Sequence, residues 1–186
     1  MKKALLLFVL MSLTLFTHAQ ENNYEELKFF KVIQSENNAD KNSLYAALRS
    51  FMAIYYANSQ NVIQMDDKDA GILIGKATSV FDSPSMMLSA YEGWLDYNLK
   101  LQARDGRVRV EVSHFFHHNK PGNQKKAQLG VLTKAEYTDK GMQKKYHNKV
   151  WLMLKEQAAK ISSDIFVNVE KVIKEGATIQ SEDDNW

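Results

Sequence analysis

The amino-acid sequence predicts an α+β domain, in which an antiparallel sheet of about five strands has two helices packed on one face. Two periodicities support this prediction. From Leu95 to Val112, apolar residues alternate with polar ones, which is typical of strands with one buried and one solvent-exposed face. From Val150 to Val172, apolar residues recur every three or four positions, which predicts a long amphipathic helix. The chain has no cysteine, so no disulfide contributes to the fold.

Residues 1–19 have the three parts of a secretory signal peptide. Lys2 and Lys3 form a positively charged start, an apolar run extends to Phe16, and Ala19 is the small residue expected before a cleavage site. The apolar run is shorter than the roughly 20 residues that a membrane-spanning helix needs. We therefore expect a periplasmic or secreted protein with no transmembrane anchor after signal cleavage.

The remainder of the chain is balanced in charge. Lys2 and Lys3 account for the formal net charge of +2, so the other basic residues match the 22 acidic ones. Nucleic-acid binding needs net or clustered positive charge, and we therefore expect no nucleic-acid partner. No linker or internal repeat is evident, so residues 20–176 are predicted to form a single α+β domain, followed by an acidic disordered tail, 177–186.

The first half of this domain is predicted to contain a strand, a helix and a hairpin. Cap residues separate the β-branched and aromatic strand from the helix, whose apolar residues share one face. The hairpin turn is acidic and ends in Gly71, which accepts the positive φ that a tight reversal requires. The predicted elements are the strand 27–33, the helix from Leu44 to about Asn58, and the hairpin strands 61–65 and 72–75.

The second half is predicted to contain another hairpin and the long helix. Asp105-Gly106 turns the chain between the two strands of alternating character, and the polar segment 119–128 is predicted to be a surface loop. The predicted elements are the strands 95–101 and 108–112, a short edge strand at Val131-Leu132, and a helix that ends at Glu175 with Gly176 as its C-cap.

Several short motifs in the first half resemble a known family. They are Lys31-Val32-Ile33, Ser43-Leu44-Tyr45, Asn61-Val62-Ile63-Gln64, the hairpin from Asp69 to Lys76, Leu99-Lys100-Leu101, and Asp105-Gly106-Arg107-Val108-Arg109. Together they resemble the secreted-protein family called domain of unknown function 4468, over roughly residues 29–116. The resemblance implies a TATA-binding-protein-like fold of order β-α-β-β-β-β-α. It implies no activity and assigns no functional residue.

Aromatic side chains are the first candidates for a ligand-binding surface. If the helices cover only one face of the sheet, aromatics on the other face form a recognition patch, because such rings combine apolar area with polar edges. The alternative is that they fill the core beneath the long helix. The candidate ligand-binding residues are Tyr91, Trp94, Tyr97, Phe115 and Phe116.

Histidines are the candidates for a metal site. On an extended strand, His114 and His118 share a face and His117 points the other way, so the three imidazoles cannot converge without a bulge. Two of them could still join His147 around zinc. The simpler interpretation is a solvent-exposed strand end beside a lysine-rich loop. We therefore expect neither a metal nor another cofactor.

Two charged segments suggest further sites that we consider weaker. Asp66, Asp67 and Asp69 lie near Gly71 as in a calcium loop, but no closing carboxylate follows at the required spacing, which favours a solvated turn. Lysines interleaved with aromatics in the second half would suit a polyanion, whereas a solvated face is the commoner role. These lysines are Lys120, Lys125, Lys126, Lys134, Lys140, Lys144, Lys145 and Lys149.

No catalytic signature is present, which favours a non-enzymatic role although it does not exclude an enzyme. The sequence therefore predicts an exported, non-catalytic binding module for an unknown protein, peptide or cell-envelope ligand. Two alternatives stay open: a periplasmic metal-dependent hydrolase that uses His114, His118 and His147, and a small-molecule carrier with an enclosed apolar cavity. Neither the ligand nor the oligomeric state follows from the sequence.

Overall fold

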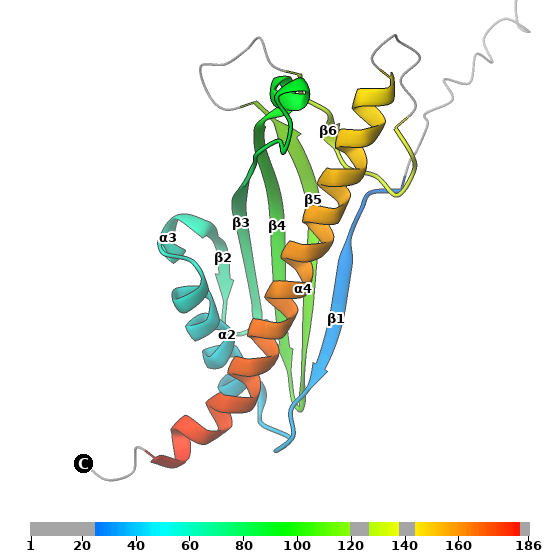
Figure 1. Cartoon of the computed structure of the whole chain (residues 1–186). Helices are drawn as coiled ribbons and strands as arrows, with labels where there is room; N and C mark the ends of the chain where they lie inside the picture. Colours follow the sequence, from blue (N-terminus) through cyan, green and yellow to red (C-terminus); the bar gives the residue numbers. More distant parts are fainter. Residues whose placement is uncertain (1–24, 120–126, 138–143, 183–186) are drawn as a thin grey trace, which may run out of the picture.

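The computed structural model describes residues 25–119, 127–137 and 144–182, which form one sheet backed by two main helices (Figure 1). The predicted signal peptide lies outside these residues. Among them, no helix is both long enough and apolar enough to cross a bilayer. The elements are β1 (Phe29–Gln34), α2 (Lys41–Tyr55), α3 (Ser59–Val62), β2 (Ile63–Asp67), β3 (Ile72–Phe81), the 3-10 helix η2 (Met86–Tyr91), β4 (Gly93–Arg104), β5 (Arg107–His118), β6 (Gly130–Val131) and α4 (Lys144–Glu182).

The sheet has six strands, and the paired ones are antiparallel. Its order is β1-β5-β4-β3-β2, and β6 extends the β1 edge by pairing with the end of β5. β1 and β2 therefore lie at opposite edges, and the chain crosses between them through α2. The predicted α+β class and the antiparallel sheet are both confirmed.

Local chemistry explains where the two main helices form. The carboxylate of Asp40 accepts hydrogen bonds from the backbone N–H groups of Asn42 (2.8 Å) and Ser43 (3.1 Å), which caps the N-terminus of α2. α2 buries Leu44, Tyr45, Leu48, Phe51 and Met52 on one side. α4 buries residues at three- and four-residue spacings: Val150, Leu154, Ala158, Ser162, Ile165, Val169 and Ile173. Ile161 and Val172, two of the predicted apolar positions, are only partly buried.

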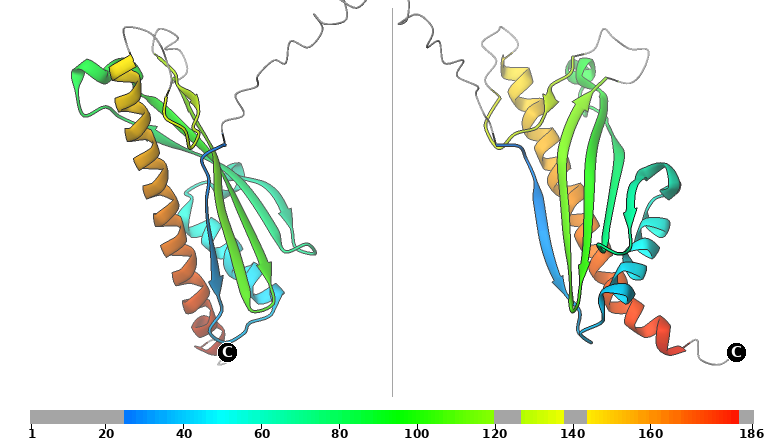
Figure 2. Two further views of the ribbon diagram at one scale, coloured as in Figure 1. Left: turned by 90° about the vertical axis from the view of Figure 1, so that its right-hand side faces the viewer. Right: turned by 180° about the vertical axis from the view of Figure 1, so that it is seen from behind.

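The core lies between the sheet and both helices. Figure 2 shows α4 running along one side of the sheet, and α2 packs against both α4 and β4. The sheet contributes the inward side chains of its long strands, among them Leu95, Leu99, Leu101, Val108, Val110 and Val112, all at most 1% exposed. The opposite face of the sheet, which we call the open face, has no helix over it among the described residues.

The structure differs from the predicted boundaries in several elements, among them α3, β3 and α4. Residues 61–62 belong to the short helix α3 rather than to a strand, and β3 continues to Phe81, well beyond the predicted end at Gly75. α4 continues to Glu182, so it passes through Gly176 and includes the first part of the segment predicted as a disordered tail. Packing of α4 on the sheet stabilises the helix, and this outweighs the low helix propensity of the first glycine.

Candidate functional site

The open face is built mainly by alternate residues of β4 and β5. Leu99 pairs with Val112 and Leu101 pairs with Val110 on the buried side, so the residues between them face outward together. The outward rows are Asn98 with Ser113, Lys100 with Glu111, Gln102 with Arg109, and Arg104 with Arg107. Polar and charged groups thus cover the centre of this face.

A β-bulge in β5 changes which residues point outward. Asp96 pairs with Phe116 and Asn98 pairs with Ser113, so one residue lies between the pairs on β4 and two lie between them on β5. The additional residue is His114, whose φ of 54° is in the left-handed region. Simple alternation from Val112 would bury Phe116; the bulge buries Phe115 instead.

The five candidate aromatic residues are divided between the two sides of the sheet. Tyr91, Tyr97 and Phe115 lie in the core and are 3%, 5% and 0% exposed. For these three, the structure corrects the idea of an aromatic recognition patch, because the helices already cover them. Trp94 and Phe116 are partly exposed on the open face. The prediction of ligand binding therefore rests on these two side chains.

Trp94 and Phe116 form an aromatic cluster with His118. The His118 ring lies edge-on to Trp94, with centroids 5.8 Å apart, and 5.6 Å from the ring of Phe116. Because the three rings come from adjacent strands of one sheet, their relative positions are fixed by the strand register. They offer apolar ring surface with a titratable edge, a combination found in recognition sites.

A hollow of about 480 Å³ lies beside this cluster and contains a carboxylate with several partners. Asp96 accepts a hydrogen bond from Thr78 (2.6 Å) and lies 3.4 Å from the ammonium of Lys76 and 3.3 Å from Nε2 of His118. Burial opposes its ionisation, but these neighbours outweigh burial and lower the pKa of Asp96. The hollow is lined by Lys76, Asp96, His114, Phe116, His118 and Gln128.

His147 lies apart from His114 and His118, the other two histidines proposed for a metal site. His114 pairs with Glu26 (3.1 Å) and His118 lies beside Asp96, both on the open face. His147 lies on α4 and packs edge-on against Tyr91 and Tyr137, at 5.4 and 5.3 Å between centroids. Within the described ranges, no group of three or more His, Cys, Asp or Glu side chains is placed to hold a metal ion. The alternative based on His114, His118 and His147 gains no support from this arrangement.

His117 points into the core, opposite to His114 and His118 as the strand spacing predicted. It is fully buried, and its Nδ1 accepts a hydrogen bond from the backbone N–H of Leu129 (3.2 Å). Its Nε2 lies 2.9 Å from the carbonyl oxygen of Tyr91 and must therefore be the protonated nitrogen. Burial lowers the pKa of His117 to about 4. The side chain is thus neutral and joins three segments of chain.

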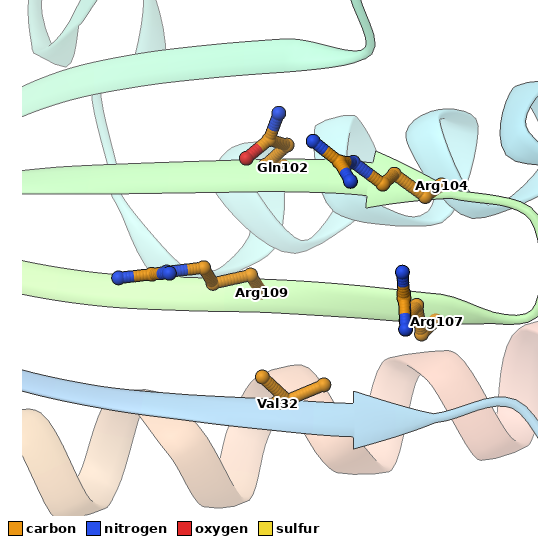
Figure 3. A pocket seen from close by; sticks show the side chains of 5 residues that line it. All are labelled: Val32, Gln102, Arg104, Arg107 and Arg109. Atoms are coloured by element: carbon orange, nitrogen blue, oxygen red, sulfur yellow. The ribbon is translucent and has the colours of Figure 1, made fainter.

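A second hollow, of about 200 Å³, lies on the open face next to the β4–β5 turn. Figure 3 shows its lining side chains on the viewer's side of β1, β5 and β4, with both helices behind the strands. The lining residues are Val32, Gln102, Arg104, Arg107 and Arg109. The alternation of apolar and polar residues from Leu95 to Val112 predicts that Arg107 and Arg109 lie on the solvent-exposed face, but it does not identify this cluster. The two-residue turn was the available signal, because it sets Arg104 opposite Arg107.

Three of the remaining charged candidates, Asp66, Asp67 and Lys134, make local hydrogen bonds or ion pairs. The Asp66 carboxylate accepts a hydrogen bond from the Tyr45 hydroxyl and pairs with Arg49 (3.0 Å). Asp67 accepts a bond from the backbone N–H of Ala70 (2.8 Å), as expected for a hairpin turn. Lys134 pairs with Glu25 (2.6 Å). Lys144, Lys145 and Lys149 lie on α4, whereas Lys120, Lys125, Lys126 and Lys140 lie outside the described residues.

The antiparallel sheet with helices on one face defines an α+β domain. Residues 29–118 match the model of the family described as "Domain of unknown function (DUF4468) with TBP-like fold". The matched segment extends from the first residue of β1 to the last residue of β5. It therefore includes α2 and almost the whole of the open face, but not α4.

Comparison with solved structures finds similar proteins. A TBP-like protein from Parabacteroides distasonis ATCC 8503 is 12% identical, with a TM-score of 0.54 and coverage of 81% of this chain and 96% of that chain. A DUF4468 family protein from Bacteroides ovatus ATCC 8483 is 16% identical, with a TM-score of 0.47 and coverage of 80% and 86%. No functionally curated protein matches the chain. At these identities, the likeness to the Parabacteroides protein shows the fold alone.

Proposed function

We propose that this domain is an exported, non-catalytic binding module that recognises a protein, peptide or cell-envelope ligand on its open face. The observation that supports this most directly is the uncovered sheet face itself. Both main helices pack on the other side, which leaves the partly exposed rings of Trp94 and Phe116 beside a hollow of about 480 Å³. Export is inferred from the sequence of residues 1–19.

The chemistry of the open face suits binding better than catalysis. Asp96 is held by Thr78, Lys76 and His118 at once, so its carboxylate has little freedom to act as a base. The hollows of this face are lined largely by charged and polar side chains. An enclosed apolar cavity, which the carrier hypothesis requires, would have a different lining. A ligand with apolar and polar parts would find complementary groups along β4 and β5.

Affinity capture from the native cell envelope, followed by mass spectrometry, tests the proposal. We expect the protein to enrich a specific partner and a Trp94→Ser, Phe116→Ser variant to lose it. Leu152→Ser is the matched control, because Leu152 is an exposed apolar residue (56%) on α4. Thermal unfolding of each variant separates lost binding from lost folding. Equal enrichment by the wild type and the open-face variant would contradict the proposal.

A further inference from the structure

The arginines of this chain are concentrated at one place. The sequence contains only four arginines among its 24 basic residues, and three of them, Arg104, Arg107 and Arg109, line the hollow next to the β4–β5 turn. The chain uses lysine almost everywhere else. Arginine differs from lysine in having a planar fork of donors that matches the oxygens of an oxyanion in pairs. The choice of arginine at this hollow therefore points to recognition of an oxyanion.

Arg104 and Arg107 are held together by the fold, and no described carboxylate compensates their charge. They are directly opposite each other on β4 and β5, where like charges are destabilising. Among the residues that the structure describes, neither guanidinium makes an ion pair with a carboxylate. The nearest acidic residue in sequence, Asp105, instead accepts a hydrogen bond from the backbone N–H of Lys41 (2.8 Å). Two positive charges thus face the same hollow.

Arg109 is positioned differently, and its charge is already balanced. Its guanidinium binds Glu111 (2.9 Å) and lies 5.0 Å from the ring centroid of Phe30. The Arg109–Glu111 pair is therefore neutral as a unit, which leaves a charge of about +2 from Arg104 and Arg107. Gln102 adds an amide donor and Val32 an apolar wall to the same hollow.

We propose that this hollow binds the phosphoryl group of a phosphate monoester, with Arg104 and Arg107 as the paired forks. A phosphate monoester carries a charge of about −1.5 to −2 near neutral pH, which matches the two unpaired guanidinium groups, whereas a carboxylate or sulfonate carries only one charge. Gln102 donates a further hydrogen bond to the bound oxygens. Because the hollow lies on the open face, the inference rests on the proposed function and names the chemical class of its ligand.

The binding test uses three small aromatic anions that differ in the charged group. Phenyl phosphate, benzenesulfonate and benzoate are titrated into the purified protein at about pH 8 and low ionic strength, where the phosphate is dianionic. We expect phenyl phosphate to bind at least about tenfold more tightly than either monoanion, because only it neutralises both arginines. Equal affinities for the three anions, or no binding of phenyl phosphate, would overturn the proposal.

Variants assign the binding to the two arginines. Arg104→Gln and Arg107→Gln are each expected to raise the Kd for phenyl phosphate about tenfold or more, and Arg107→Lys should restore only part of the loss, because it keeps the charge without the fork. Arg49→Gln is the matched control, since Arg49 is an exposed arginine that pairs with Asp66 on another part of the molecule. An unchanged Kd in both glutamine variants would contradict the assignment.

Further measurements test the phosphoryl proposal independently of folding and of the binding-module proposal. Without ligand, Arg107→Gln should melt at or above the wild-type temperature, because it removes a like-charge contact. Vesicles with phosphatidic acid, compared with phosphatidylglycerol, distinguish a lipid monoester from a soluble one, and binding in either form supports the site. If the glutamine variants still capture the partner that Trp94→Ser, Phe116→Ser loses, and phenyl phosphate does not bind, the phosphoryl proposal fails and the binding-module proposal stands.

Discussion

The backbone N–H of Leu129 donates a hydrogen bond to Nδ1 of His117, 3.2 Å away and fully buried. On the other side of the ring, Nε2 is 2.9 Å from the carbonyl oxygen of Tyr91. This arrangement requires a neutral imidazole, because a protonated Nδ1 would face the Leu129 N–H with a second hydrogen. The segment around Leu129 and the end of η2 are therefore attached to β5 through one titratable side chain.

We predict that this side chain makes the domain less stable in mild acid. Burial lowers the pKa of His117 to about 4, below the ordinary value of 6.5, so the unfolded chain takes up the proton first. The contribution of neutral His117 to the free energy of unfolding is complete above pH 6.5 and is lost as the pH falls toward 4. It amounts to roughly 3 kcal/mol in total. Denaturant unfolding at about pH 7.5 and about pH 4.5 measures the loss.

A substitution distinguishes His117 from the other titratable groups. His117→Leu lowers stability at neutral pH because it removes both hydrogen bonds, but its stability should depend much less on pH in this window. Carboxylates with lowered pKa values, such as Asp96, lose their contribution to the free energy of unfolding only at lower pH. His114→Ala, on the exposed side, serves as the control. An equally steep loss in His117→Leu would show that another group is responsible.

We predict very different costs for truncating two adjacent phenylalanines. The bulge at His114 buries Phe115 completely, where its ring packs 6.0 Å from that of Tyr97, and leaves Phe116 partly exposed. Phe115→Ala should cost about 3–5 kcal/mol, since it leaves a cavity in the core. Phe116→Ala should cost about 1 kcal/mol. Denaturant unfolding of both variants tests the register, and reversed costs would place the bulge elsewhere in β5.

Two glycines with left-handed backbone provide a matched pair. Gly71 has a φ of 68° and Gly130 a φ of 73°, so an alanine is strained at both positions. A Cβ on Gly71 would lie 2.7 Å from the carbonyl oxygen of Ala103, whereas a Cβ on Gly130 would have no atom within 4 Å. Gly130→Ala should therefore cost about 1 kcal/mol and Gly71→Ala clearly more. Similar unfolding free energies for the two variants would contradict the close packing of the β2–β3 turn against β4.

Much of the fold was predictable because local patterns and tertiary packing agree. The alternation from Leu95 to Val112 identified β4, the first part of β5 and their buried face, and the spacing from Val150 to Val172 identified α4. The bulge at His114 was not predictable, since it depends on how β5 pairs with β4. It also determines which of Phe115 and Phe116 is exposed, so the sequence alone could not show which of the candidate aromatic residues lie at the surface.

The arginine cluster was missed for a different reason. The charge of the whole domain is balanced, which directs attention away from local clusters of one sign. Arg104 and Arg107 are separated by a two-residue turn, and that spacing places them opposite each other in any tight hairpin. Strand register, applied to charged residues as well as to apolar ones, would have identified the pair. Val32 joins the hollow only because β1 pairs with β5, which the sequence does not indicate.

The last prediction concerns metal content. A zinc hydrolase built on His114, His118 and His147 requires these side chains to reach one ion. However, His114 pairs with Glu26 on the open face, whereas His147, on α4, packs against the rings of Tyr91 and Tyr137. We expect elemental analysis of the purified protein to find no stoichiometric zinc and added zinc to leave the melting temperature unchanged, because the described residues contain no preformed set of metal ligands that would lower the free energy of the folded state. His114→Ala is the informative variant: zinc bound at one equivalent in the wild type and lost in this variant would require the strand end to rearrange and would restore the hydrolase as a candidate.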